Sequence, residues 1–92
     1  FGLFQVTRTN EDIAFLGACA LHPRAGLTAH DAQEAAIKRA MVEGAARRIV
    51  LTDATKLDVV APSAVASLQE LDLVVSDAQP AWLRAAVKIE RV

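Results

Sequence analysis

The chain has 92 residues, enough for one small domain or for part of one, and its formal net charge is -1. Hydrophobic residues make up 53% of it, which excludes a disordered tail, and the near-neutral charge argues against a nucleic-acid-binding surface. Every apolar run falls short of the roughly 20 residues of a membrane span, and the single cysteine, which permits no internal disulfide, suits a cytoplasmic protein.

The first third of the chain is predicted to hold two strands and a loop. Residues 1–8 alternate weakly between apolar and polar, which favours a short strand, and residues 9–12 form a polar turn. Residues 13–16 are an apolar, buried strand, and Gly17 then opens a run of small residues that lets a ligand or another strand approach the backbone. Residues 21–26 are predicted as a loop because they contain Pro23 and Gly26.

A helix is predicted over residues 31–46. Asp31 can cap the amides of the first turn, with Glu34 three residues later in a variant of the capping box. Arg47 and Arg48 are predicted to end the helix, where cations favour the negative end of the helix dipole. The apolar stripe expected to face the sheet consists of Ala36, Ile37, Ala40, Met41, Gly44 and Ala45.

The remaining chain alternates between apolar and mixed segments. Two further buried strands are predicted at residues 49–52 and 73–76, separated by a mixed segment at 61–71, and a short helix at 80–87 precedes an edge strand at 88–92. Strands separated by helical or mixed segments pair in parallel. The predicted fold class is therefore α/β, with a three-layer architecture and a mostly parallel sheet.

Several polar residues stand where such a fold binds ligands, which is outside the carboxyl ends of the strands. Lys56 lies just beyond the second strand and can meet an anion as a point charge. Asp53 and Asp77 end strands, and each can accept ligand hydroxyls or cap the next segment. Glu34 and Lys38 form an i,i+4 pair with the acid first. Plainer interpretations are also open: Lys56 as a solvated lysine in a loop, and Glu34 with Lys38 as an ion pair on the surface of a helix.

Metal and thiol chemistry are not indicated. His22 and His30 lack further ligands at useful spacing, and zinc sites need three or four convergent ligands. Cys19 has no basic neighbour in the sequence that would activate its thiol, so it is interpreted as structural. The sequence predicts no cofactor.

Five blocks recur in this order in one family: Asp12-Ile-Ala-Phe-Leu-Gly-Ala18, Gly26-Leu-Thr28, Glu34-Ala-Ala-Ile-Lys-Arg-Ala-Met41, Leu51-Thr-Asp-Ala-Thr-Lys56 and Leu71-Asp-Leu-Val-Val-Ser-Asp77. From about residue 12 onward, the chain resembles the C-terminal sensor domain of the DeoR family of bacterial transcriptional repressors. Two departures stand out. The family has Phe-Gly after the lysine, where this chain has Leu57-Asp58, and it has a second glycine and an isoleucine where this chain has Cys19-Ala20-Leu21. An acid at position 58 would repel a phosphate.

The resemblance implies a fold related to ribose-5-phosphate isomerase, with a phosphorylated sugar or a similar metabolite as effector. It implies that residues 1–92 are the second half of the sensor domain, and that DNA is bound only through an N-terminal winged helix-turn-helix absent from this chain. In the related isomerases an acid near the position of Glu34 is the base for proton transfer. Together with their predicted places, the resemblance makes these residues effector-binding candidates: Lys56, Glu34, Lys38, Asp53, Asp77 and Gly17.

Two alternatives to a non-enzymatic regulatory module stay open. One is a fragment of a sugar-phosphate isomerase-like enzyme, and the other is a structural assembly domain that has lost its ligand. In each case a half-domain leaves a sheet edge and one sheet face uncovered. The sequence therefore predicts a homo-oligomer that makes no contact with a membrane.

Overall fold

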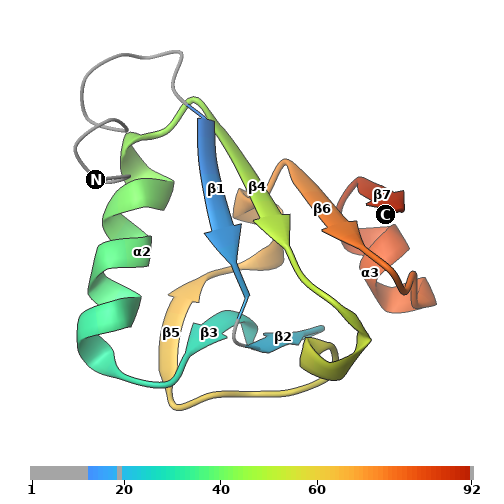
Figure 1. Ribbon diagram of the computed structural model, residues 1–92, viewed down its shortest axis with the longest axis horizontal. Helices are drawn as coiled ribbons and strands as arrows, with labels where there is room; N and C mark the ends of the chain where they lie inside the picture. The colour runs from blue at the N-terminus through green and yellow to red at the C-terminus, as the bar shows by residue number, and fades with distance from the viewer. Residues whose placement is uncertain (1–12, 19, 92) are drawn as a thin grey trace.

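A four-stranded parallel sheet, here called sheet A, is the larger of the two sheets in the described residues. The structure is a computed structural model and describes residues 13–18 and 20–91. Sheet A has the order β1-β4-β6-β7, and every neighbouring pair is parallel. Figure 1 shows β1, β4 and β6 with their arrowheads at the same end. The bounds are β1 (Ile13–Gly17), β4 (Arg47–Leu51), β6 (Leu73–Ser76) and β7 (Ile89–Arg91).

The predictions for sheet A are confirmed. The three apolar runs are parallel neighbours, and the last strand is an edge strand that pairs with β6. The predicted strand at residues 1–8 and the turn at 9–12 lie outside the described residues, as does Cys19. An α/β fold with a mostly parallel sheet is thus established for the described part of the chain.

A second, antiparallel sheet, here called sheet B, replaces the loop predicted at residues 21–26. It consists of β2 (Ala20–His22), β3 (Gly26–Ala29) and β5 (Ser63–Ala66), in the order β2-β3-β5. The imidazole Nδ1 of His22 accepts the backbone N–H of Arg24 at 3.1 Å and that of Ala25 at 3.3 Å, which closes the turn. The turn signal was correct, but the strands around it are too short for a visible alternation.

In the described residues, two helices and two short 3₁₀ turns connect the strands. The helix α2 (Ala32–Gly44) begins after Asp31, whose carboxylate accepts the N–H of Glu34 at 2.7 Å, so the predicted cap is confirmed. The helix α3 (Ala81–Ala86) follows Pro80. The 3₁₀ turns are η1 (Ala54–Lys56) and η2 (Leu68–Glu70). None of the helices in the described residues is long and apolar enough to cross a membrane.

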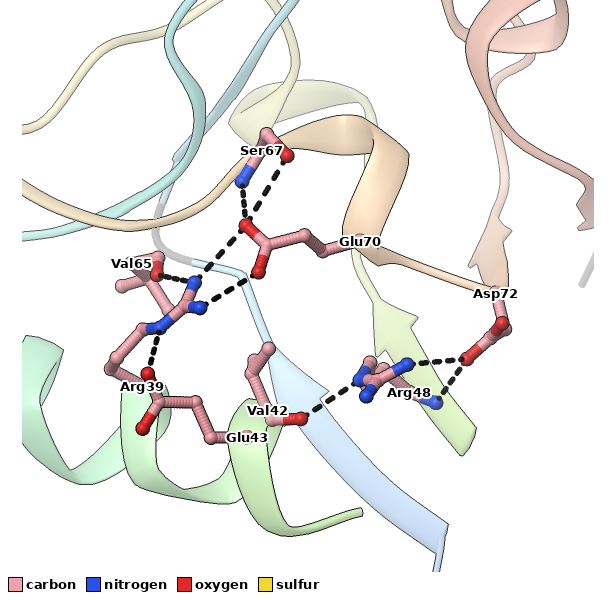
Figure 2. A network of polar contacts seen from close by, with 8 residues as sticks. All are labelled: Arg39, Val42, Glu43, Arg48, Val65, Ser67, Glu70 and Asp72. Atoms are coloured by element: carbon pink, nitrogen blue, oxygen red, sulfur yellow. Dashed lines mark hydrogen bonds and ion pairs between the residues drawn. The ribbon is translucent and has the colours of Figure 1, made fainter. Parts of the chain in front are cut away.

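The prediction that Arg47 and Arg48 end the helix was wrong. The helix ends at Gly44, and both arginines belong to β4. Arg48 donates hydrogen bonds to two residues outside β4 (Figure 2). Its side-chain Nε donates to the carbonyl of Val42 at 2.8 Å, and its backbone N–H donates to the carboxylate of Asp72 at 2.8 Å. The side-chain position therefore follows from these tertiary partners rather than from the helix dipole.

The buried side of α2 also differs from the predicted stripe. Ala35 and Val42 are the buried residues of this helix, whereas Ile37 is 52% exposed. Lys38 and Arg39 lie on the inner side, where their stems cover apolar surface and their charged ends reach the backbone of other elements. A pattern that counts only apolar residues assigns such long polar side chains to solvent, and this shifted the predicted stripe.

Among the described residues, a hydrophobic core lies between sheet A, sheet B and the helices α2 and α3. From sheet A it takes only residues of one face, namely Ala14, Leu16, Val50 and Val74. Against these pack Val42 of α2, Leu27 and Val65 of sheet B, and Leu83 of α3. Trp82 is partly buried and packs against this core.

Candidate functional site

The carboxyl ends of β1, β4 and β6 form one edge of sheet A. In the register Gly17 stands beside Leu51, and Leu51 stands beside Val75. The pairing continues just beyond the strands, because Ala18 N–H donates to the carbonyl of Leu51 and Thr52 N–H to that of Val75. The residues that follow these strands therefore gather at the same edge, which is where open α/β sheets bind ligands.

A first group of candidate residues lies at the end of β1. The ammonium of Lys38 on α2 donates to the carbonyl of Gly17 at 2.5 Å and lies 3.3 Å from the carboxylate of Glu34. The i,i+4 pair predicted from the sequence is thus present, and it is anchored to the strand end rather than extended into solvent. Its lysine is largely covered, with 15% of the side chain exposed.

A second group lies beyond β4 and β6, around the turn η1. The carboxylate of Asp53 caps this turn by accepting the backbone N–H of Thr55 at 2.9 Å and its hydroxyl at 2.5 Å. The carboxylate of Asp77 accepts the N–H of Ala54 at 2.9 Å. Asp53 and Asp77 therefore hold the turn from two neighbouring strand ends, in the capping role that the sequence left open. Lys56 is the last residue of this turn and is half-buried.

Electrostatics keep one of these acids ionised. Hydrogen bonds from Thr55 and the nearby positive charge of Lys56 hold the pKa of Asp53 below its ordinary value. An ionised Asp53 accepts hydrogen bonds from Thr55 and cannot donate one to a ligand. The edge as a whole thus presents two ammonium groups, Lys38 and Lys56, together with carboxylates that already accept hydrogen bonds or pair with a cation.

Asp58, which replaces the glycine typical of the resembled family, adopts a backbone conformation that glycine favours. Its φ angle is +62°. Among the described residues, Asp58 is the non-glycine residue with a positive φ angle. Its N–H donates to the carbonyl of Leu21 at 2.7 Å, and its carboxylate lies 3.8 Å from His22. The acid is therefore accommodated beside sheet B, close to a histidine.

Sequence analysis missed an ion-pair network on the side of α2 that faces β5. Arg39 binds both carboxylate oxygens of Glu70, the carbonyl of Val65 and the carboxylate of Glu43 (Figure 2). The Glu70 carboxylate also accepts the N–H and hydroxyl of Ser67. The pattern Ser-x-x-Glu at residues 67–70 was the available signal, because it is typical of a capping box.

This network predicts an acid-sensitive stability. The hydrogen bond from Arg39, followed by that from the Ser67 backbone, lowers the pKa of Glu70 from 4.5 to about 2. Because the folded-state pKa is the lower one, the stabilisation is complete above about pH 4.5 and is lost as pH falls toward 2. We expect Glu70→Gln to cost about 1 kcal/mol at pH 7 and to flatten the loss of thermal stability between pH 5 and pH 2.5.

Thermal unfolding followed by circular dichroism across this pH range measures the effect. Glu43→Gln is the matched control, since Glu43 binds the same arginine at the more exposed end of the network. An equal change in both variants would show that the pH dependence does not come from Glu70.

No group of three or more histidine, cysteine, aspartate or glutamate side chains is placed to hold a metal ion in the described part of the chain. His22 accepts two backbone N–H groups of its own turn.

Comparison with known proteins identifies the family. Residues 3–78 match the model of the DeoR C-terminal sensor domain. The HTH-type transcriptional regulator GlpR of Haloferax volcanii is 43% identical over 70 residues, which cover 76% of this chain and 28% of that protein. The deoxyribose operon repressor of Escherichia coli K12 is 33% identical over 79 residues, covering 84% of this chain and 31% of that protein.

The chain spans less than a third of the length of either relative. Both relatives are named for transcriptional regulation. The match covers more than half of the chain, and it includes the strand ends and the turn η1. The chain belongs to the DeoR C-terminal sensor domain family.

Proposed function

We propose that this chain is the effector-binding part of a DeoR-type transcriptional regulator and that its effector is a phosphorylated sugar or a related metabolite. The family match over residues 3–78 carries the proposal. The names of the two relatives support a regulatory role, and one of them is a repressor of a deoxyribose operon.

The effector is proposed to bind at the carboxyl edge of sheet A. Lys56 supplies a positive charge at the end of η1, and Lys38 supplies a second one beside Gly17. A phosphate monoester carries up to two negative charges, so it matches an edge with two lysines better than a neutral sugar does. Glu34 adds a carboxylate next to Lys38 that can accept a sugar hydroxyl.

The two strand-end aspartates are proposed to act indirectly. Asp53 and Asp77 hold the backbone of η1 through hydrogen bonds to Thr55 and Ala54. They thereby orient the turn that carries Lys56. Part of their capacity to accept hydrogen bonds is used within the protein and not for a ligand. Binding of operator DNA is assigned to a helix-turn-helix segment outside these 92 residues, in line with the name of the first relative.

Isothermal titration calorimetry on the full-length regulator tests the function. A panel of sugar phosphates is titrated next to the same sugars without phosphate. We expect at least one phosphorylated member to bind and its unphosphorylated form to bind at least about tenfold more weakly, because a charge-assisted contact contributes roughly 1.5–3 kcal/mol. Equal affinity for the phosphorylated and unphosphorylated sugars would exclude a site that recognises the phosphate group. Turnover of a sugar phosphate would instead favour the isomerase-like alternative.

A further inference from the structure

The segment that follows Lys56 lies beside β2, beyond the carboxyl edge of sheet A. β2 begins three residues after β1 ends, and η1 begins three residues after β4 ends. Leu57 pairs with Leu21 in a parallel bridge, and the carbonyl of Leu21 accepts the N–H of Asp58 at 2.7 Å and that of Val59 at 3.3 Å. Figure 1 shows β2 and the turn η1 side by side, below the arrowheads of β1 and β4. Asp58 is therefore held close to the edge proposed for the effector.

The imidazole of His22 has a fixed orientation. Its Nδ1 accepts the N–H of Arg24 at 3.1 Å and that of Ala25 at 3.3 Å, which assigns the proton of the neutral ring to Nε2. Nε2 lies 3.8 Å from the carboxylate oxygen Oδ1 of Asp58. A hydrogen-bond donor and a negatively charged acceptor therefore stand opposite each other as long as His22 closes its own turn.

The carboxylate of Asp58 keeps its capacity to accept hydrogen bonds. Its side chain is 71% exposed, and the distance of 3.8 Å to His22 is too long for a direct hydrogen bond. Within the described residues, no other donor of the protein reaches this carboxylate. Asp53 and Asp77 differ in this respect, because their carboxylates accept backbone N–H groups of η1. Asp58 is thus better placed than these two aspartates to bind a ligand directly.

A hydroxyl group complements this pair of side chains, whereas a phosphate group does not. One oxygen atom fits within normal hydrogen-bond distance of two atoms that lie 3.8 Å apart. A hydroxyl accepts and donates at the same time, so it can accept from Nε2 of His22 and donate to the carboxylate of Asp58. A phosphate dianion offers only acceptor oxygens and carries the same sign of charge as Asp58, which repels it.

We propose that His22 and Asp58 bind a hydroxyl group of the effector and exclude a second phosphate group from this end of the site. The inference rests on the proposed function and narrows its effector to sugar monophosphates. Two residues of chain span at most about 7 Å, so a single sugar phosphate reaches from Lys56 to Asp58. Asp58 replaces the glycine typical of the resembled family, so the selection is assigned to this chain's own residue.

Calorimetric titration of the full-length regulator with the monophosphates and bisphosphates of ribose, fructose and glucose tests this selection. We expect the parent to bind at least one monophosphate at least about tenfold more tightly than the bisphosphate of the same sugar. Asp58→Gly should weaken binding of that monophosphate and strengthen binding of the bisphosphate, each by at least about threefold. Folding is not at risk, because glycine adopts the φ of +62° without strain.

Asp58→Asn separates the charge from the shape of the side chain. Asparagine also tolerates a positive φ and still hydrogen-bonds a hydroxyl, but it carries no charge. It should keep the affinity for the monophosphate within about threefold and gain affinity for the bisphosphate as the glycine variant does. Glu43→Gln is the matched control, since it neutralises an exposed carboxylate near the end of α2, shortly before the amino end of β4. It should change neither affinity.

Failure of this inference is distinguishable from failure of the proposed function. If no sugar phosphate binds the parent, the proposed function is wrong and the inference falls with it. If a monophosphate binds and Asp58→Gly changes both affinities by the same factor, the function stands, but the roles of Asp58 and His22 are overturned. A parent protein that binds a monophosphate and its bisphosphate equally well also overturns the inference.

Discussion

Gly26→Ala is expected to destabilise the domain by about 2–4 kcal/mol, the largest effect on stability that we predict for a single methyl group. Gly26 has a φ of +74°, a conformation that costs an L-residue roughly 1 kcal/mol or more. A Cβ at this position would also collide with the backbone carbonyl of Ala66 on β5. Because backbone cannot swing aside as a flexible side chain does, β3 and β5 would have to separate.

Gly17→Ala is the matched control for this substitution. The Cβ added there meets no atom within 4 Å, and Gly17 has no positive φ. Its effect on stability is expected to stay within about 1 kcal/mol and to be stabilising if anything, since alanine is less flexible than glycine in the unfolded chain. Urea unfolding of both variants measures the difference. Similar losses at the two positions would contradict the described geometry of the turn between β2 and β3.

The pairing of β1, β4 and β6 in sheet A was predictable because each of these strands lies in an apolar run that stands out from its neighbours in the sequence. Residues 13–16, 49–52 and 73–76 are continuous apolar runs with helical or mixed segments between them. That order permits few topologies once parallel pairing and right-handed connections are assumed. The structure confirms the pairing with shifts of one or two residues at the strand ends.

Sheet B was not predictable in the same way. Its strands have three or four residues, and all four residues of β3 are buried, so no alternation of polar and apolar positions is visible. The third strand, β5, comes from a distant segment that the sequence marks only as mixed. Pairing between β3 and β5 depends on α2 bringing residues 29 and 63 together, which is tertiary information.

In the candidate site, too, the positions of residues could be predicted from the sequence, but contacts between distant residues could not. Strand-end reasoning correctly grouped Asp53, Asp77 and Gly17 at one edge of the sheet. It did not reveal that the two aspartates bind backbone N–H groups of one turn, because a hydrogen bond between Asp77 and Ala54 joins residues far apart in the chain. The same holds for Lys38, whose contact with Gly17 follows from the packing of α2 on β1.

Lys56→Ala is expected to weaken binding of the sugar phosphate effector by about ten- to a hundredfold. Lys56 lies in a turn held by Asp53 and Asp77, at the edge where the strands end. A lysine–phosphate contact is a charge-assisted hydrogen bond that contributes roughly 1.5–3 kcal/mol, and each 1.4 kcal/mol corresponds to a factor of ten in affinity. Calorimetric titration of the full-length regulator with the best-binding member of the panel measures the change.

Lys88→Ala serves as the control, because it removes the same charge from an exposed residue just before β7, away from the carboxyl ends of β1, β4 and β6. Gly17→Ala adds an independent probe, since the open space around its Cβ leaves folding intact while a ligand close to the strand end would meet the new methyl group. If Lys56→Ala and Gly17→Ala both bind every sugar phosphate as the parent does, the effector does not bind at this edge. If only Lys56→Ala is impaired, the phosphate lies beyond β4, and the ligand does not reach the end of β1.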